Sequence, residues 1–155
     1  MIATTPTNEQ GKPMGYVYVD VTLTNLFTRK SAAVCALVDT GSFLSVIPAS
    51  FAVELGFDPD EMSTRIATLA DGSRVERPAV PLEVEFQDRR TTCDALVMGN
   101  ECVVGVLALE AMALVVDPVR QCVILDPKQP DGPVQFAGKG AIFRELAEEF
   151  NRRRP

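Results

Sequence analysis

The first clear pattern in the chain is an alternation of apolar and polar residues in YVYVDVTLTNL, residues 16–26. Alternation at every second position is typical of a β-strand with one face in the core and the other in solvent. The next segment, AAVCALV at residues 32–38, is a nearly continuous run of small and β-branched residues, which predicts a second, more buried strand. The folded part therefore begins near Gly15 with two strands.

A short helix is expected after a third strand. Residues 44–48, LSVIP, predict a strand that ends at Pro48. Residues 49–56 then predict a helix, with Ser50 as its N-cap and Gly56 as its C-terminal stop.

A β-hairpin is expected in residues 63–86, where two extended segments are joined by Asp71-Gly72. The positive φ angles that this dipeptide accepts suit a tight hairpin turn. The projecting tip consists of Ala70, Asp71, Gly72 and Ser73. Taken alone, the segment needs no explanation beyond an ordinary surface hairpin.

The remaining patterns complete a mainly β chain. They first predict a strand at residues 91–98 and a short buried strand of Val103 and Val104 that ends at Gly105. A short apolar helix follows, then a strand that starts at Leu114 and a last strand at residues 122–127.

The pattern changes after the last strand. Residues 128–140 are rich in proline and glycine and predict a linker, and apolar residues at helical spacing predict an amphipathic helix over 141–152. We therefore divide the chain into a polar lead (1–14), one domain (15–127), and the linker with the C-terminal helix (128–155).

Composition narrows the classes of partner. A chain of 155 residues with 46% hydrophobic residues is long enough for one domain with a substantial core. Its net charge of −6 repels phosphate backbones, so we do not expect a nucleic acid partner. The start of the chain lacks a signal-peptide pattern and no apolar run is long enough to span a bilayer, so we expect a cytoplasmic protein without a membrane partner.

The histidine and cysteine content limits the possible chemistry. The chain has no histidine, which excludes a Ser-His or Cys-His relay and a His-ligated metal site. Its four cysteines, Cys35, Cys93, Cys102 and Cys122, stand singly among apolar neighbours, as expected for buried thiols in a reducing compartment. We expect no metal and no cofactor.

The candidate chemistry lies at Asp39, which ends the second predicted strand and precedes Thr40, Gly41 and Ser42. Glycine permits a sharp turn and a close approach of another chain, and the two hydroxyls can fix a carboxylate. One carboxylate cannot act at once as base toward water and as acid toward a leaving group, whereas two that share a proton can.

No second D-T-G supplies the other carboxylate. Asp71, Asp117 and Asp126 lie in Asp-Gly or Asp-Pro dipeptides, for which turn formation is a sufficient explanation. Two-fold symmetry would bring Asp39 of two copies together, so catalysis requires a homodimer. For an isolated motif, a plain Asx turn without catalysis remains the alternative.

The chain resembles the retropepsin-like aspartic proteases, the family of the retroviral proteases and of small bacterial single-domain relatives. Three segments that occur in order carry the resemblance: ALVDTGSFLSVIP, LADGSRVE and VVGVLALEAMALVVDP. The resemblance spans residues 15–127 and implies a closed, mainly β barrel with short helices that is active as a homodimer. It implies that Asp39 is catalytic, that Thr40 reaches across the dimer axis, that Gly41 lies where substrate backbone passes, and that Ser42 donates to the outer oxygen of Asp39.

The same resemblance assigns the other motifs and the reaction. It implies that the tip at residues 70–73 is a flap that closes over bound peptide, and that Val103, Val104 and Gly105 pack beneath the active loop as structural support. The implied activity is that of an aspartic endopeptidase, in which the Asp39 pair activates a water that attacks a peptide bond.

Other functions stay open at this point. A dimeric module of the same fold could bind peptide or protein without cutting it, although such a module has no need for Asp39, Thr40 and Gly41. The net charge and the basic end NRRRP would also suit an acidic regulatory protein. The helix over 141–152 departs from the family pattern; it could pack on the dimer or the domain, cover the cleft, or tether a partner.

Overall fold

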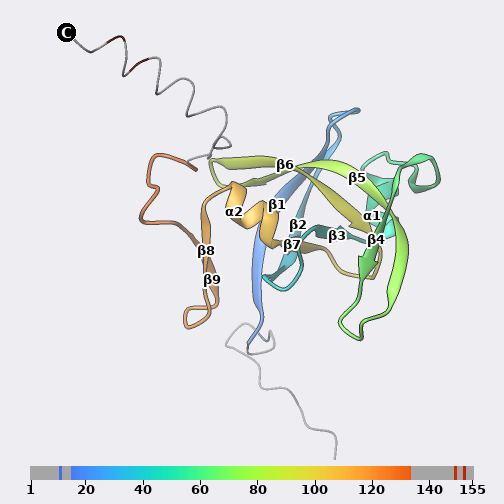
Figure 1. The fold of residues 1–155 in the computed structure, drawn as a ribbon, viewed down its shortest axis with the longest axis horizontal. Coiled ribbons are helices and arrows are strands. Elements are labelled where there is room, and N and C mark those ends of the chain that lie inside the picture. The colour runs from blue at the N-terminus through green and yellow to red at the C-terminus, as the bar shows by residue number, and fades with distance from the viewer. Residues whose placement is uncertain (1–10, 12–14, 134–148, 150–151, 153–155) are drawn as a thin grey trace, which may run out of the picture.

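The computed structural model describes residue 11, residues 15–133, and residues 149 and 152. Over these residues the protein is mainly β, with short helical segments (Figure 1). The elements are β1 (Val17–Asn25), β2 (Ser31–Asp39), β3 (Ser45–Ile47), α1 (Ala49–Glu54), η1 (Pro59–Glu61), β4 (Thr64–Thr68), β5 (Arg74–Phe86), β6 (Arg89–Val97), β7 (Val103–Gly105), α2 (Val106–Ala111), β8 (Leu114–Asp117) and β9 (Cys122–Leu125). None of the described helices is long and apolar enough to cross a membrane.

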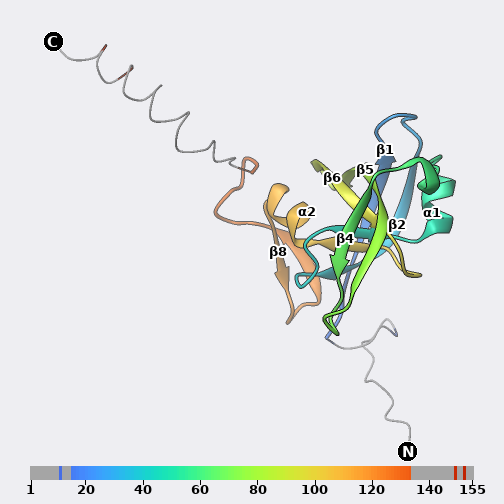
Figure 2. The same ribbon diagram turned by 45° about the vertical axis from the view of Figure 1, so that its right-hand side comes forward.

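Six strands close into a barrel, as the sequence predicts. They follow the order β1-β2-β7-β3-β6-β5, and the barrel closes because β1 also pairs with β5. β4 continues the sheet beyond β5, and β8 pairs with β9 in a separate sheet. The β4–β5 and β8–β9 hairpins lie on the right and the left of the barrel in Figure 1, and Figure 2 shows them from a second direction. Every predicted strand has a counterpart.

The core explains the alternation in β1 but corrects the expectation for β2. Val17, Val21 and Leu23 are 3–6% exposed and point into the barrel, so the half-buried first strand is confirmed. The prediction that the second strand is more buried than the first is wrong, because Ala36 is the sole fully buried residue of β2 and Cys35 is exposed. Small and β-branched residues favour a strand, but they do not determine how much of its outer face a single chain covers.

The predicted helix is present as α1, although its N-cap differs from the prediction. Pro48 is the N-cap and Ser50 lies within the first turn, because the Pro48 carbonyl oxygen accepts the N–H groups of Phe51 (3.1 Å) and Ala52 (3.0 Å). Gly56 follows the helix at φ +82°, a left-handed conformation that glycine adopts without strain, so the predicted stop is confirmed.

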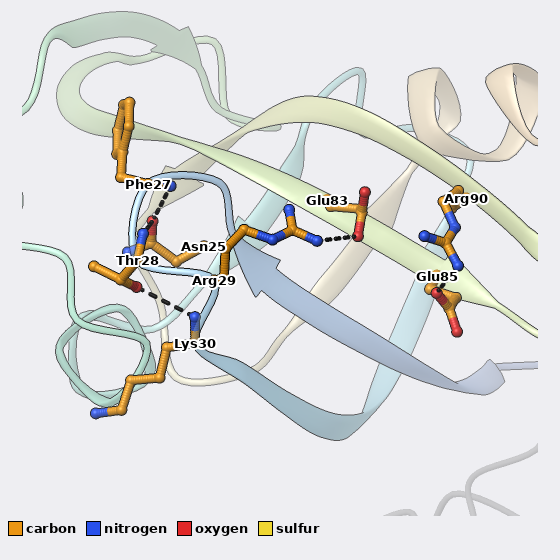
Figure 3. Close-up of polar contacts among 8 residues, drawn as sticks. All are labelled: Asn25, Phe27, Thr28, Arg29, Lys30, Glu83, Glu85 and Arg90. Atoms are coloured by element: carbon orange, nitrogen blue, oxygen red, sulfur yellow. Dashed lines mark hydrogen bonds and ion pairs between the residues drawn. The ribbon is translucent and has the colours of Figure 1, made fainter.

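A buried asparagine organises the turn between β1 and β2 (Figure 3). The Asn25 side chain oxygen accepts the N–H groups of Phe27 (2.8 Å) and Thr28 (3.2 Å), and its amide donates to the Leu55 carbonyl (3.0 Å). In the same view Arg29 forms an ion pair with Glu83 on β5 (3.3 Å). Asn25 therefore fixes the turn and ties it to the end of α1.

A buried arginine attaches the chain beyond β9 to the barrel. The Arg89 side chain donates to the carbonyl oxygens of Met112 (3.0 Å), Gln129 (2.9 Å) and Pro130 (3.3 Å). The start of the predicted linker is therefore held against the barrel. The predicted helix over 141–152 lies outside the described residues apart from positions 149 and 152, as does the predicted lead, residues 1–14, apart from residue 11.

We expect Arg89→Met to lower the free energy of unfolding by about 1–3 kcal/mol, because the buried Met112 carbonyl would lose its side-chain donor. Urea denaturation monitored by circular dichroism would measure the loss. Arg90→Met is the matched control, since Arg90 is exposed and forms a surface ion pair with Glu85, which is worth about 0–1 kcal/mol. Equal urea midpoints for the two variants would contradict the anchoring role of Arg89.

Candidate active site

The loop that carries the D-T-G motif connects β2 to β3 at the surface of the chain. Asp39, Thr40 and Gly41 are all exposed. The Gly41 N–H donates to Oδ1 of Asp39 (2.8 Å), and the Ser42 N–H donates to the Asp39 carbonyl oxygen (3.1 Å). The loop is thus an Asx turn that fixes the orientation of the carboxylate, and Asp39 remains accessible.

Ser42 differs from the expectation that its hydroxyl donates to Asp39. The Ser42 hydroxyl donates to the Leu44 carbonyl oxygen instead (2.7 Å). Because a hydroxyl has one proton to donate, that bond excludes donation to the carboxylate in this arrangement. Ser42 therefore stabilises the bend of the loop into β3, and the donor to the carboxylate is the Gly41 backbone.

β7 and the start of α2 lie directly against this loop, at the segment that the family resemblance assigns to its structural support. Asp39 is paired in register with Gly105, and Val38 with Val104. The N–H groups of Val106 and Leu107 donate to the carbonyl oxygens of Ser42 (2.8 Å) and Phe43 (3.2 Å). The loop backbone is therefore held by a segment more than 60 residues away in the sequence.

Gly105 is required by close packing. A Cβ atom at this position would lie 2.5 Å from the carbonyl carbon and oxygen of Leu44, and 2.9 Å from the Ser42 carbonyl oxygen. The Gly105 N–H also donates to the hydroxyl of Ser45 (3.2 Å), which is buried. Ser45 was not predicted as a site residue, because its one signal in the sequence is a polar residue within a short, otherwise apolar strand.

A pocket of about 680 Å³ lies between this loop and β4. Its lining residues are Asp39, Gly41, Ser42, Phe43, Leu44, Val46, Arg65, Ile66, Ala67, Thr68, Leu69, Ala70, Leu96 and Met98. Asp39 is the one carboxylate among them and Arg65 the one cation. Most of the lining is apolar, and the contributions from β4 and β6 were not predicted because they depend on strand packing.

The hairpin tip has a different turn from the predicted one. Gly72 has a positive φ (+82°) and Asp71 does not, so the tip is not the two-residue turn in which both angles are positive. The Leu69 N–H donates to the Ser73 carbonyl (2.8 Å), which leaves residues 70–72 as the loop. Of the four predicted tip residues, Ala70 lines the pocket and the other three do not.

Asp71 stabilises the tip through Ser73. The Ser73 hydroxyl (2.6 Å) and N–H (2.9 Å) both donate to the same oxygen of Asp71. These bonds favour the ionised form, the hydroxyl bond most strongly, and hold the pKa of Asp71 below its usual value. A lowered pKa means that this stabilisation is present above the usual Asp range and is lost as the pH falls through the lowered value.

We expect Ser73→Ala to raise the pKa of Asp71 toward its ordinary value, since the larger of the two hydrogen bonds is removed while the backbone bond remains. A carboxyl NMR titration would follow the Asp71 signal in both chains. Ser50→Ala, at an exposed serine in α1, is the control and should leave the titration unchanged. An Asp71 midpoint that does not move in Ser73→Ala would contradict this explanation.

The family assignment agrees with this geometry. A family model described as aspartyl protease matches residues 22–111, a range that contains the D-T-G loop, the β4–β5 hairpin and β7. The chain belongs to this family, and its retropepsin-like fold confirms the resemblance seen in the sequence. No curated protein sequence matches the chain.

Two solved structures have a similar fold. One is a retropepsin-like aspartic protease from Rickettsia conorii, with 17% identity, a TM-score of 0.51, and coverage of 72% of this chain and 80% of that one. The other is the retroviral protease-like domain of Ddi1 from Leishmania major, with 17% identity, a TM-score of 0.53, and coverage of 81% and 98%. At this identity the comparison establishes the fold.

Proposed function

We propose that the protein is an aspartic endopeptidase in which Asp39 residues from two subunits of a homodimer activate a water molecule. The observation that carries the proposal is the position of Asp39. Its carboxylate is exposed, is held by the Gly41 N–H, and borders a largely apolar pocket in which it is the one acidic residue. Because the described residues that line the pocket include no second carboxylate, the proposal takes it from a second copy of the chain, and the exposure of the loop supports such a contact.

The mechanism follows from two carboxylates a few ångströms apart. Because both cannot ionise together at moderate pH, the pair carries one shared proton. The ionised carboxylate accepts a proton from water as it attacks the scissile carbonyl carbon, while the protonated one donates a hydrogen bond to the carbonyl oxygen. The pair then passes a proton to the departing amine as the carbon–nitrogen bond breaks. No covalent intermediate with the enzyme forms.

The remaining residues have supporting roles in this proposal. Thr40 stabilises the contact between the D-T-G loops of the two subunits, and Gly41 leaves room for the backbone of an extended peptide. The tip at residues 70–73 acts as a flap over that peptide, which forms main-chain hydrogen bonds as in strand addition. Val103, Val104 and Gly105 keep the loop in place, a role that the close contacts of Gly105 support.

We also propose the domain division and the compartment. The catalytic domain is residues 15–127, after the lead 1–14 and before the linker and helix 128–155. The cytoplasmic location rests on the sequence pattern. Of the four cysteines that the sequence predicts to be buried thiols, Cys102 is buried, Cys93 and Cys122 are partly buried, and Cys35 is exposed, which corrects that expectation. Burial raises the pKa of the Cys102 thiol to about 11, which keeps it protonated and unreactive.

Cleavage of a diverse peptide library at high protein concentration, from pH 4 to 7, tests the function. We expect cuts within extended peptides. Specific activity should rise with protein concentration, because a monomer supplies one of the two catalytic carboxylates that the mechanism requires. A dimer that binds extended peptides without cutting them would overturn the peptidase proposal and favour the peptide-binding module.

A further inference from the structure

Arg65 is the one basic residue among those that line the pocket. It lies on β4, and the nearby lining is mainly apolar, from Phe43, Leu44, Leu96 and Met98. Apart from the carboxylate of Asp39, the charged residue of the lining is this cation, and a cation beside apolar lining favours a ligand group of negative charge. The D-T-G chemistry makes no use of this cation.

The hydrogen bonds of Arg65 leave it able to bind a further group. Its Nη2 atom forms an ion pair with Oδ2 of Asp94 (3.2 Å), and its Nη1 atom donates a long bond to the Thr64 carbonyl (3.5 Å). The Arg65 side chain is still 53% exposed and Asp94 is 39% exposed. Because a guanidinium group has five N–H donors, a carboxylate can bind beside Asp94 or replace it.

The cross-strand neighbour increases the local positive charge. Arg65 on β4 is directly opposite Arg77 on β5, and like charges at opposite positions destabilise each other. Asp94 is the one acidic group paired with Arg65 among the described residues. A second carboxylate at Arg65 would therefore relieve repulsion. The net charge of −6 gives acidic peptides no general advantage, so any preference must be local.

We propose that Arg65 is a specificity-determining residue that selects peptide substrates with an acidic side chain near the scissile bond. This inference rests on the proposed function and adds the class of substrate. The apolar part of the pocket takes an apolar side chain of the extended peptide, and the guanidinium group of Arg65 binds a Glu or Asp side chain farther along it.

The test uses two sets of peptides based on one cleaved sequence. In the first set Glu is placed in turn at each of four positions on either side of the scissile bond, and in the second set Gln takes the same positions. At pH 6 we expect one position at which Glu raises kcat/KM about 2- to 5-fold over Gln, the range of one exposed ion pair. The ratio should fall toward one as the pH drops through the Glu range near 4.3, since the neutral side chain loses the ion pair.

Three variants separate recognition from a structural effect. Arg65→Gln should abolish the preference for Glu. Arg77→Gln removes the same charge from the neighbouring strand, at a residue that does not line the pocket, and should weaken the preference without abolishing it. Asp94→Asn should increase the preference, because it frees the cation from its competitor. If Arg65 only held β4 in place, Arg65→Gln and Asp94→Asn would change the ratio in the same direction, and that result would overturn the proposal.

Binding to the Asp39→Asn chain distinguishes the two proposals. If that chain binds the Glu peptide more tightly than the Gln peptide and the unsubstituted chain cuts neither, the role of Arg65 stands and the peptidase function fails. If the unsubstituted chain cuts both peptides equally at every position, the peptidase function stands and the role of Arg65 fails. If the protein neither cuts nor binds any of the peptides, both the peptidase function and the role of Arg65 fail.

Discussion

Asp39→Asn should reduce peptide cleavage by at least ~100-fold while the protein stays folded, because Asn has nearly the same shape as Asp and cannot take part in proton transfer. Asp39 is exposed, so the substitution buries no unpaired group. Its side-chain oxygen can still accept the Gly41 N–H, which preserves the turn. Initial rates at pH 4 to 7 would measure the loss, and urea denaturation would check the fold.

Two controls make this result specific. Asp88→Asn causes the same chemical change at an exposed turn residue that does not line the pocket, and should leave the rate unchanged. Mixing equal amounts of unsubstituted and Asp39→Asn chains tests the shared site: about one quarter of the dimers would then carry two aspartates. Activity per unsubstituted chain should fall to about half. Activity that depends only on the amount of unsubstituted chain would show that one Asp39 suffices.

Gly105→Ala should lower both stability and cleavage. The added methyl group would lie 2.5 Å from the Leu44 carbonyl atoms, and these are backbone atoms that cannot rotate away. Overpacking of this kind costs about 1–3 kcal/mol of unfolding free energy. Because Gly105 is in register with Asp39, relief of the clash would move the D-T-G loop, and a displacement of about 1 Å at an active site can reduce the rate by about 100-fold.

Gly41→Ala provides the contrast. Its added methyl group would meet only the side-chain oxygen of Asp39, at 3.1 Å, and Gly41 is exposed. We expect a change in stability within about 0.5 kcal/mol and a clear loss of cleavage, because the carboxylate must turn aside. Denaturation and initial rates on both variants would separate the two effects. A Gly105→Ala chain as stable as the unsubstituted one would contradict the packing explanation.

The elements of the barrel were predictable from sequence because their signals are local. The alternation in residues 16–26 predicted β1, and Pro48 and Gly56 marked the limits of α1. The predictions of the α1 N-cap and of the hairpin turn were wrong, because more than one local backbone arrangement suits the same residues. Ser50 is a good N-cap residue, but the backbone of Pro48 already accepts the first N–H groups. Asp71-Gly72 suits a two-residue turn, but the tip adopts a three-residue loop in which Gly72 alone needs a positive φ.

The sequence by itself determined the strands, the turn signals and the D-T-G motif, because each depends on residues that are neighbours in the chain. Only the tertiary structure decided that Gly105 lies against Leu44, that the buried Arg89 side chain donates to the Met112 carbonyl oxygen, and that Arg65 borders the pocket of Asp39. These contacts join residues far apart in the sequence. The order in which the strands pair fixes them, and periodicity within a strand carries no information about which strand will lie beside it.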